Sequence, residues 1–140
     1  MNPLPRAISG WIALGLWGLS LIGPYSVAGG YGQPPEPEGG DGLILLFWGW
    51  LGPFFYSFAW FANFPFGLAV YRLIRGRLPG YLSAVSSAII GYSVLIPHRG
   101  VDPRAPHWRA EVFVGPAIHL WLAALTIVAL AQFIPADEDE

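Results

Sequence analysis

Few residues of this 140-residue chain could do chemistry, and His119 comes first because it lies roughly two turns inside the apolar run 112–134. A histidine at that depth could bind a haem iron, with His98, near the same end of the run, as a second axial ligand. The alternative is a neutral imidazole that is hydrogen-bonded between helices, to Ser57, Asn63 or a backbone carbonyl. A single histidine among apolar residues more often has this second role, and the sequence therefore favours it.

A second group of candidates lies in an aromatic-rich stretch around Asn63. Such a surface could stack against a flat cofactor, a quinone or a lipid ring, whereas the simpler interpretation is packing inside a small helical bundle. Asn63 could satisfy carbonyls that Pro65 leaves free, or it could line a polar pocket with His119. The candidate ligand-binding residues are therefore Trp60, Asn63 and His119, with haem or a quinone as the conceivable cofactor. The aromatic residues of the stretch are Trp48, Trp50, Phe54, Phe55, Tyr56, Phe58, Trp60, Phe61, Phe64 and Phe66.

Catalytic and metal-binding patterns are missing from the rest of the sequence. There is no cysteine, which excludes disulfides and thiolate chemistry. Glu36 and Glu38 lie in a glycine- and proline-rich stretch that cannot hold catalytic geometry. His98, Asp102 and His107 match no familiar spacing of metal ligands. The sequence thus predicts no enzyme, no catalytic residue and no metal site, and its net charge of −2 gives no reason to expect nucleic-acid binding.

The elements that must position the candidate residues are apolar and long. The chain is 54% hydrophobic and 11% charged, with a mean hydropathy of +0.50, which is typical of a membrane protein and not of a soluble one. A bilayer core needs ~20 apolar residues in a helix. We expect one integral membrane domain over 1–140, all-α, built as a compact bundle of four transmembrane helices. The predicted helices are 7–27, 43–62 with an extension over 65–77, 81–96 and 112–134.

Two of the predicted helices have unusual features. The second lies in Leu43–Tyr71, which has no charged residue, and Gly52–Pro53 should kink it. The third, 81–96, is short, and its small residues predict close packing inside the bundle. The alternative is a three-span protein in which 81–96 does not cross. We expect the loop 29–42 to be flexible and the acidic tail 135–140 to be mobile. The small residues of the third helix are Gly80, Ser83, Ala84, Ser87, Ala88 and Gly91.

One segment resembles a pattern in small bacterial inner-membrane proteins. It contains Trp50–Pro53, then Phe58–Asn63, the nearby Pro65, and Arg75-Gly76-Arg77 after aliphatic residues. The pattern has the form F-A-W-aromatic-A-N-P before a leucine-rich helix. This chain matches it over about 43–77 and departs from it by placing Phe64 between the asparagine and the proline. The resemblance implies a four-helix membrane fold and implies no particular activity.

The arginines predict the orientation of the bundle. All seven basic residues are arginine, which suggests a GC-rich bacterial genome. With four spans, Arg6, Arg72, Arg75 and Arg77 share one side, and three arginines lie on the other. The positive-inside rule then places both termini in the cytoplasm, in a multi-pass protein of the bacterial inner membrane. Arg72, Arg75 and Arg77 should contact anionic headgroups, or alternatively an acidic patch of a partner.

Three functions agree with this sequence. The first is a non-catalytic accessory or scaffold subunit that packs against a larger membrane complex or against itself. The second is a binding module for haem, a quinone or a lipid inside the bundle. The third is a small homo-oligomeric channel or a membrane-disrupting effector, although little polar sequence is present to line a pore. The expected partners are the lipid bilayer and a membrane protein or further copies of the chain.

Overall fold

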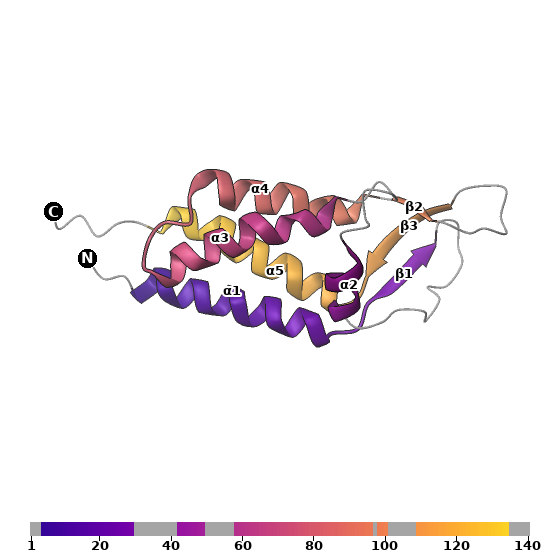
Figure 1. The fold of residues 1–140 in the computed structure, drawn as a ribbon, viewed down its shortest axis with the longest axis horizontal. Coiled ribbons are helices and arrows are strands. Elements are labelled where there is room, and N and C mark those ends of the chain that lie inside the picture. The colour runs from indigo at the N-terminus through magenta and orange to yellow at the C-terminus, as the bar shows by residue number, and fades with distance from the viewer. Residues whose placement is uncertain (1–3, 30–41, 50–57, 97, 101–108, 135–140) are drawn as a thin grey trace.

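The fold is mainly helical, and its long helices lie side by side as a bundle (Figure 1). The structure is a computed structural model, and it describes residues 4–29, 42–49, 58–96, 98–100 and 109–134. The helices of the bundle are α1 (Leu4–Ile22), α3 (Asn63–Ile74), α4 (Tyr81–Tyr92) and α5 (Pro116–Leu130). Short 3-10 helices extend three of them, namely η2 (Ala59–Ala62) before α3, η3 (Ser93–Leu95) after α4 and η4 (Ala131–Phe133) after α5.

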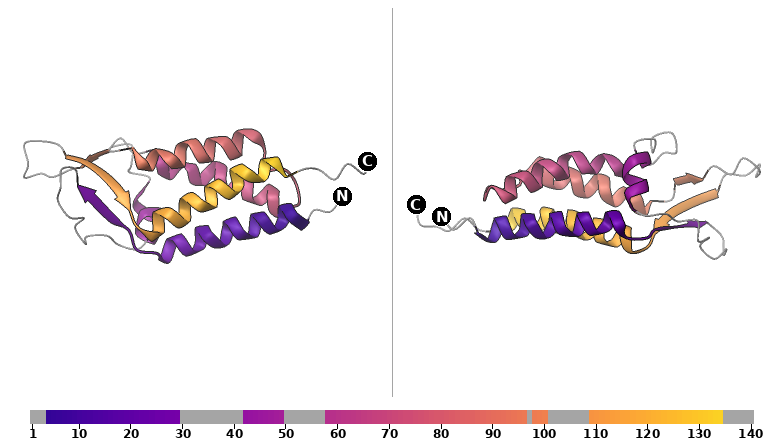
Figure 2. Two further views of the ribbon diagram at one scale, coloured as in Figure 1. Left: turned by 180° about the vertical axis from the view of Figure 1, so that it is seen from behind. Right: turned by 60° about the horizontal axis from the view of Figure 1, so that its bottom comes forward.

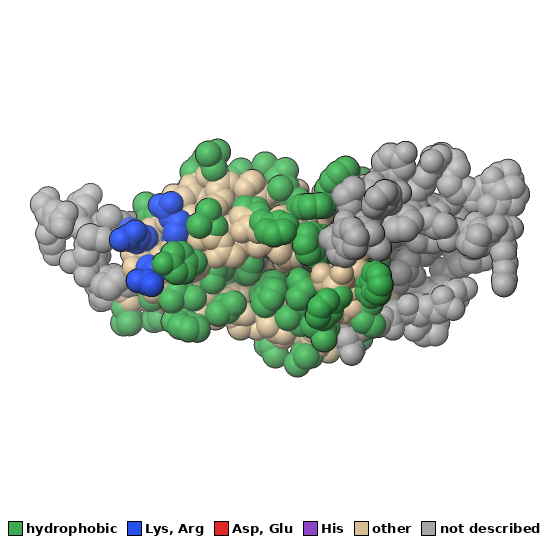
Figure 3. Space-filling view, viewed as in Figure 1, with side chains coloured by type: hydrophobic (Ala, Val, Ile, Leu, Met, Phe, Trp, Pro, Cys, Tyr) green, Lys and Arg blue, Asp and Glu red, His purple; other side chains and the backbone are tan. Residues whose placement is uncertain are grey.

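The four helices of the bundle alternate in direction. The start of α1, the turn between α3 and α4 and the end of α5 lie at one end of the molecule (Figures 1 and 2). Arginine side chains gather at this end (Figure 3), which we call the arginine end after Arg72, Arg75 and Arg77. The opposite end carries a small sheet, and we call it the sheet end.

The sheet was not predicted from the sequence. Its strands β1 (Ser26–Gly29), β2 (His98–Gly100) and β3 (Arg109–Val114) pair antiparallel in the order β1-β3-β2. In the register, Ser26 lies opposite Val114, and His98 lies opposite Glu111. The first predicted helix ran to residue 27 and the last began at 112, so the structure replaces both helix ends with strand.

Two proline-containing breaks explain these shorter helices. Pro24 cannot donate a backbone hydrogen bond, so α1 ends at Ile22 and the chain turns into β1. Before α5, Gly115 has φ of 116°, a conformation that favours glycine and separates β3 from the helix. The backbone N–H of Ala117 donates to the Pro24 carbonyl at 3.1 Å. The two breaks are therefore joined to each other at the sheet end.

The region predicted as the second span is divided into separate pieces. Helix α2 covers only Gly42–Trp48, and the predicted kink at Gly52–Pro53 lies outside the described residues. The next described segment begins at Phe58 and forms η2, which continues directly into α3. Asn63 is itself helical, with φ of −62° and ψ of −30°. Pro65 is accommodated because it stands in the first turn of α3, where backbone N–H groups have no partner within the helix.

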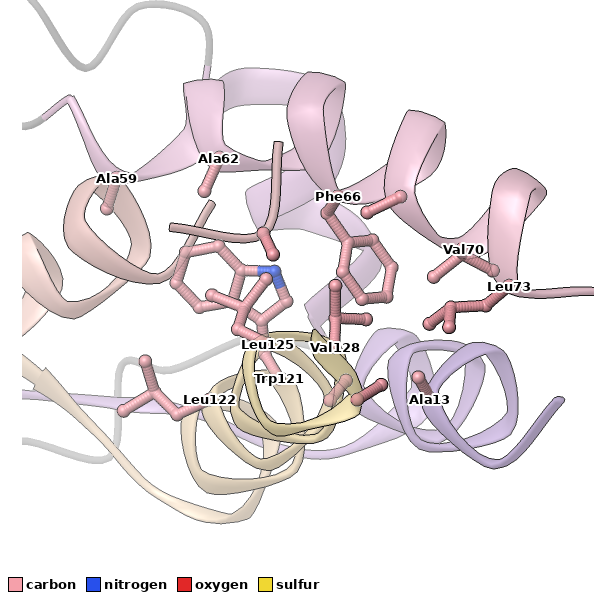
Figure 4. Close-up of a cluster of buried hydrophobic side chains, with 14 of the residues drawn as sticks. Ala13, Ala59, Ala62, Phe66, Val70, Leu73, Trp121, Leu122, Leu125 and Val128 are labelled. Atoms are coloured by element: carbon pink, nitrogen blue, oxygen red, sulfur yellow. The ribbon is translucent and has the colours of Figure 1, made fainter. Parts of the chain in front are cut away.

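The core of the bundle combines large aliphatic residues with small ones. Leu73, Leu125 and Val128 are fully buried, and Figure 4 shows them between α1, α3 and α5. Gly10 lets α1 approach α3, since a Cβ atom there would lie 2.9 Å from the backbone nitrogen of Ile74. This close approach is the kind of contact that small residues allow between helices.

Helix α4 uses its small residues for contact within the bundle. Ala84, Ser87 and Gly91 are buried, and a Cβ atom on Gly91 would lie 2.0 Å from a methyl carbon of Leu125. The Ser87 hydroxyl donates to the Ala84 carbonyl, so it needs no partner on another helix. The opposite side of α4 is exposed at Leu82. The helix is therefore packed on one side, whereas the sequence predicted that it would lie inside the bundle.

Two described helices are long and apolar enough to cross a membrane. They are α1, with 19 residues, and the 18 residues Pro116–Phe133 that join α5 to η4. Tyr81–Leu95 is apolar but shorter. Large apolar side chains are exposed along the bundle, and Figure 3 shows them between the two ends of the molecule.

Candidate functional site

Asn63 is the polar centre of the helix junction next to the sheet end. Its amide oxygen accepts two hydrogen bonds at 3.1 Å, one from the indole nitrogen of Trp17 on α1 and one from that of Trp121 on α5. Its amide nitrogen donates to the Trp60 carbonyl at 2.9 Å. A carbonyl oxygen has two lone pairs, so both acceptor positions of the Asn63 side chain are occupied. One side chain thus connects α1, α3 and α5.

Trp60 connects helix α2 to the same junction. Its indole nitrogen donates to the Leu46 carbonyl at 2.8 Å. The Trp60 ring also meets Phe61 and Phe64 edge to face, with ring centroids 5.3 Å and 5.2 Å away. Edge-to-face pairs of this kind are favourable beyond the area that they bury. Phe61 and Phe64 therefore fix the position of the Trp60 ring, and the hydrogen bond from Trp60 attaches α2 to it.

An apolar cavity lies beside this junction. Its volume is about 270 Å³, and residues of α1, α2, η2, α3, β3 and α5 contribute to its wall. A volume of this size is near the lower end of ligand sites in proteins, which begin at ~300 Å³. Trp17, Trp60 and Trp121 form part of the wall, together with Leu45 and Ile118. The cavity is large enough for a small ligand. The part of its wall that the structure describes consists mostly of hydrocarbon and indole groups.

Most of the polar side-chain atoms in the described wall already have partners within the protein. The indole nitrogens of Trp17, Trp60 and Trp121 all donate to protein oxygens. The Ser20 hydroxyl donates to the Trp17 carbonyl at 2.6 Å. The ring of Tyr25 packs edge to face on Phe113, 5.9 Å between centroids. The wall is therefore chemically apolar although it contains several polar residue types.

The cavity opens along one side of α2. Ile44 and Trp48 both line the cavity, and they are 48% and 64% exposed. Each of them therefore touches the cavity with one part of its side chain and is open to the surroundings with another. The two residues are four positions apart and so share one face of α2. The mouth is therefore bordered by an aliphatic and an aromatic side chain.

The structure brings together two of the three predicted ligand-binding residues. Trp60 and Asn63 both line the cavity. His119 does not, because it is exposed on the outer side of α5, and the described lining contains no histidine. Ser57, which the sequence offered as a partner for His119, lies outside the described residues.

Sequence reasoning missed Trp17 and Trp121 as members of this site. Both stand in apolar helices that are far from Asn63 in the sequence, and their separations from it are 46 and 58 positions. A tryptophan in such a helix usually indicates packing or an interfacial position, so nothing in its local sequence points to a shared acceptor. Only the three-dimensional packing of α1 and α5 against α3 reveals the pair.

The predicted arginine group lies at the opposite end from the cavity. Arg72, Arg75 and Arg77 are exposed there, and the Arg72 side chain donates to the Leu78 carbonyl at 2.9 Å. The Arg75 guanidinium lies 5.3 Å from the centroid of the Tyr71 ring. Arg6 differs from these three because it is buried, and it donates to the carbonyl of Ile134, which directly follows η4. Within the described residues, no group of three histidine, cysteine or acidic residues is placed to hold a metal ion.

Comparison of the chain with protein-family models, curated proteins and solved structures finds no match. The resemblance of 43–77 to small four-helix inner-membrane proteins therefore stays a prediction. The geometry of the cavity and of the bundle is the basis on which a function can be proposed.

Proposed function

We propose that this chain is a multi-pass protein of the bacterial inner membrane. Helix α1 is about 28 Å long at ~1.5 Å per residue, close to the ~30 Å of a bilayer core. Only 22% of α1 is buried inside the protein, so its apolar surface needs another apolar environment. The arginine side chains lie at one end of this apolar band (Figure 3), as a membrane surface requires.

We further propose that all four helices of the bundle cross the bilayer. Helices α3 and α4 lie alongside α1 and α5 and connect the two ends of the molecule (Figure 2). Helices that pack against spanning helices and run between the same two ends of the molecule share their environment. Four described arginines stand at the arginine end, and the positive-inside rule places that end, with both termini, in the cytoplasm.

The function that the geometry supports best is a non-catalytic binding module for an apolar molecule. The single observation that carries this proposal is the cavity beside Asn63, a space of about 270 Å³ with an apolar wall and an exposed apolar mouth. Apolar pockets with a few oriented polar groups are the usual form of small-molecule sites. Haem, a quinone and a lipid, the candidates that the sequence offers, are all molecules that partition into membranes.

The test is to identify a small molecule that depends on the cavity. The protein would be purified in mild detergent, and the bound molecules would be measured by native mass spectrometry and by an absorbance spectrum. We expect a bound molecule in the wild type and its loss in Leu45→Phe, which enlarges a side chain of the wall. Leu43→Phe is the matched control, because Leu43 lies on the same helix, is exposed and does not line the cavity. Equal occupancy in both variants would contradict the proposal.

A second candidate function is the accessory subunit, and one surface favours it. Gly15 and Gly18 on α1 have open space where a Cβ atom would be, and the neighbouring Trp11 is exposed. A helix of a partner could approach closely there. Small residues on α4 could also allow a partner to approach, but those of α4 pack against other helices of the same bundle. A pull-down in mild detergent that recovers a stoichiometric partner from wild type but not from Gly15→Leu would support this function.

A further inference from the structure

We propose that the cavity holds the hydrocarbon chain of a membrane lipid, which enters sideways past α2. This inference rests on the proposed function, because it names the class of apolar molecule that the cavity binds. It separates a lipid chain from the other two candidates, a quinone ring and a haem.

The wall of the cavity has little to offer a polar ring. A quinone carbonyl needs a hydrogen-bond donor, but the indole donors of Trp17, Trp60 and Trp121 are all directed to protein oxygens. The donors that remain in the described wall, the Tyr25 hydroxyl and the Trp48 indole, lie at the sheet end and at the mouth, so they do not serve a ring held among the other three tryptophans. A haem needs an axial ligand, and His119 is turned away from the described wall. Burying a polar group without a partner is costly, whereas a hydrocarbon chain has no such requirement. The chemistry of the wall therefore favours a chain.

The mouth of the cavity faces the environment from which a chain would come. Ile44 and Trp48 border the mouth, and the exposed side chain of Phe47 continues the apolar surface around α2. In the proposed orientation, this surface contacts lipid near the membrane surface at the sheet end. A chain can therefore pass from the bilayer into the cavity without crossing a polar region.

Tyr25 supplies a place for the polar part of the lipid. It lines the cavity and lies at the sheet end, immediately before β1. Among the described wall residues, it carries the remaining hydroxyl, since that of Ser20 is bonded to the Trp17 carbonyl. A tyrosine at the membrane surface is a common contact of lipid headgroups. The chain would thus lie among the tryptophans with its polar end toward Tyr25.

Helix α2 is attached firmly enough to act as the outer wall. The Gly42 backbone nitrogen donates to the Gly23 carbonyl at 3.0 Å, and Gly42 packs so closely that an added Cβ would meet the Ser20 carbonyl. The bond from Trp60 to Leu46 holds the other half of the helix. A wall that is fixed at two points keeps the cavity open without a ligand to support it.

Quenching of tryptophan fluorescence by brominated stearate tests the inference directly, because bromine quenches only indoles that it approaches closely and four tryptophans line the cavity. The purified full-length protein in mild detergent would be titrated with the probe. Competition with unbrominated stearate, with a benzoquinone that has no tail and with haem would be measured as loss of the bound probe in native mass spectra, because the quinone and haem quench indole fluorescence themselves. We expect saturable quenching by the probe, displacement of the probe by stearate, and no displacement by the quinone or by haem. Leu45→Phe should weaken the apparent affinity about tenfold, and Leu43→Phe should not change it.

The outcomes distinguish this inference from the proposed function. If the tailless quinone or haem displaces the probe, the hydrocarbon assignment is wrong while the cavity remains a binding site. If no probe binds saturably and the two phenylalanine variants match the wild type, both proposals are wrong. Thermal unfolding of each variant shows whether it is folded, and Ile118→Phe gives a second way to fill the cavity from a different helix.

Discussion

The amide oxygen of Asn63 accepts a hydrogen bond from the indole nitrogen of Trp121, 58 positions away in the sequence, at 3.1 Å. Trp17 donates to the same oxygen at the same distance. In an apolar interior, each of these groups would be costly to bury alone. The junction therefore fixes the relative positions of the first and last helices through an atom on a third.

Replacement of Asn63 by leucine should destabilise the protein by about 2–4 kcal/mol, because two indole donors lose their acceptor and each unsatisfied donor costs ~1–3 kcal/mol. The measurement is unfolding in mixed micelles, followed by circular dichroism. Trp121→Phe removes one donor and should cost less in the Asn63→Leu background than in the wild type. Costs that simply add would mean that the two side chains are not coupled.

Gly10→Ala should destabilise the protein by about 1–3 kcal/mol, the usual cost of overpacking, because the new methyl group would press on the backbone of α3. Gly15→Ala on the same helix is the matched control. Nothing lies near its Cβ position, and alanine is the better helix former, so the stability should be unchanged or higher. A comparison of the two thermal unfolding midpoints checks this, and equal midpoints would contradict the close contact of α1 with α3.

Trp60→Phe should loosen α2 while the bundle remains folded. The substitution removes the hydrogen bond to the Leu46 carbonyl, whose net contribution is about 1 kcal/mol. Hydrogen exchange measured by mass spectrometry should become about fivefold faster in α2 and stay unchanged in α5. Trp48→Phe, an exposed tryptophan of α2 itself, is the control and should leave the exchange unchanged. Faster exchange throughout the protein would instead indicate general destabilisation.

The proposed membrane orientation can be mapped with single cysteines, since the natural chain has none. We expect Ser26→Cys, at the sheet end, to react with a membrane-impermeant maleimide in whole cells. Leu78→Cys, in the turn between α3 and α4, should react only after the cells are opened. Ile96→Cys separates four spans from three, because it should behave like Ser26→Cys only if α4 crosses. Reaction of Ile96→Cys and Leu78→Cys under the same condition would support three spans.

The sequence predicted the helical class and the approximate places of α1, α4 and α5, because long apolar runs and small residues at helical spacing are local signals. Helix α3 instead lies where only an extension of the second span was expected. The sequence also grouped Trp60 with Asn63, since both lie in the aromatic-rich stretch, and both line the cavity. It did not predict the sheet, whose strands are three to six residues long and pair across the length of the chain. It grouped His119 with Asn63 because His119 lies deep in an apolar run. Depth along a helix does not show which side of the helix a residue is on, and His119 is on the exposed side.

The order of the strands has a consequence for how the protein is made. β3 lies between β1 and β2, yet it is the last of the three to leave the ribosome. Until residues 109–114 are synthesised, neither β1 nor β2 has its partner strand. In the same way, α1 cannot make its contact with α5 until α5 is synthesised. Formation of the sheet and of the contact between α1 and α5 is therefore postponed until these segments are made, and a chain interrupted before residue 109 would contain apolar helices without the element that unites them.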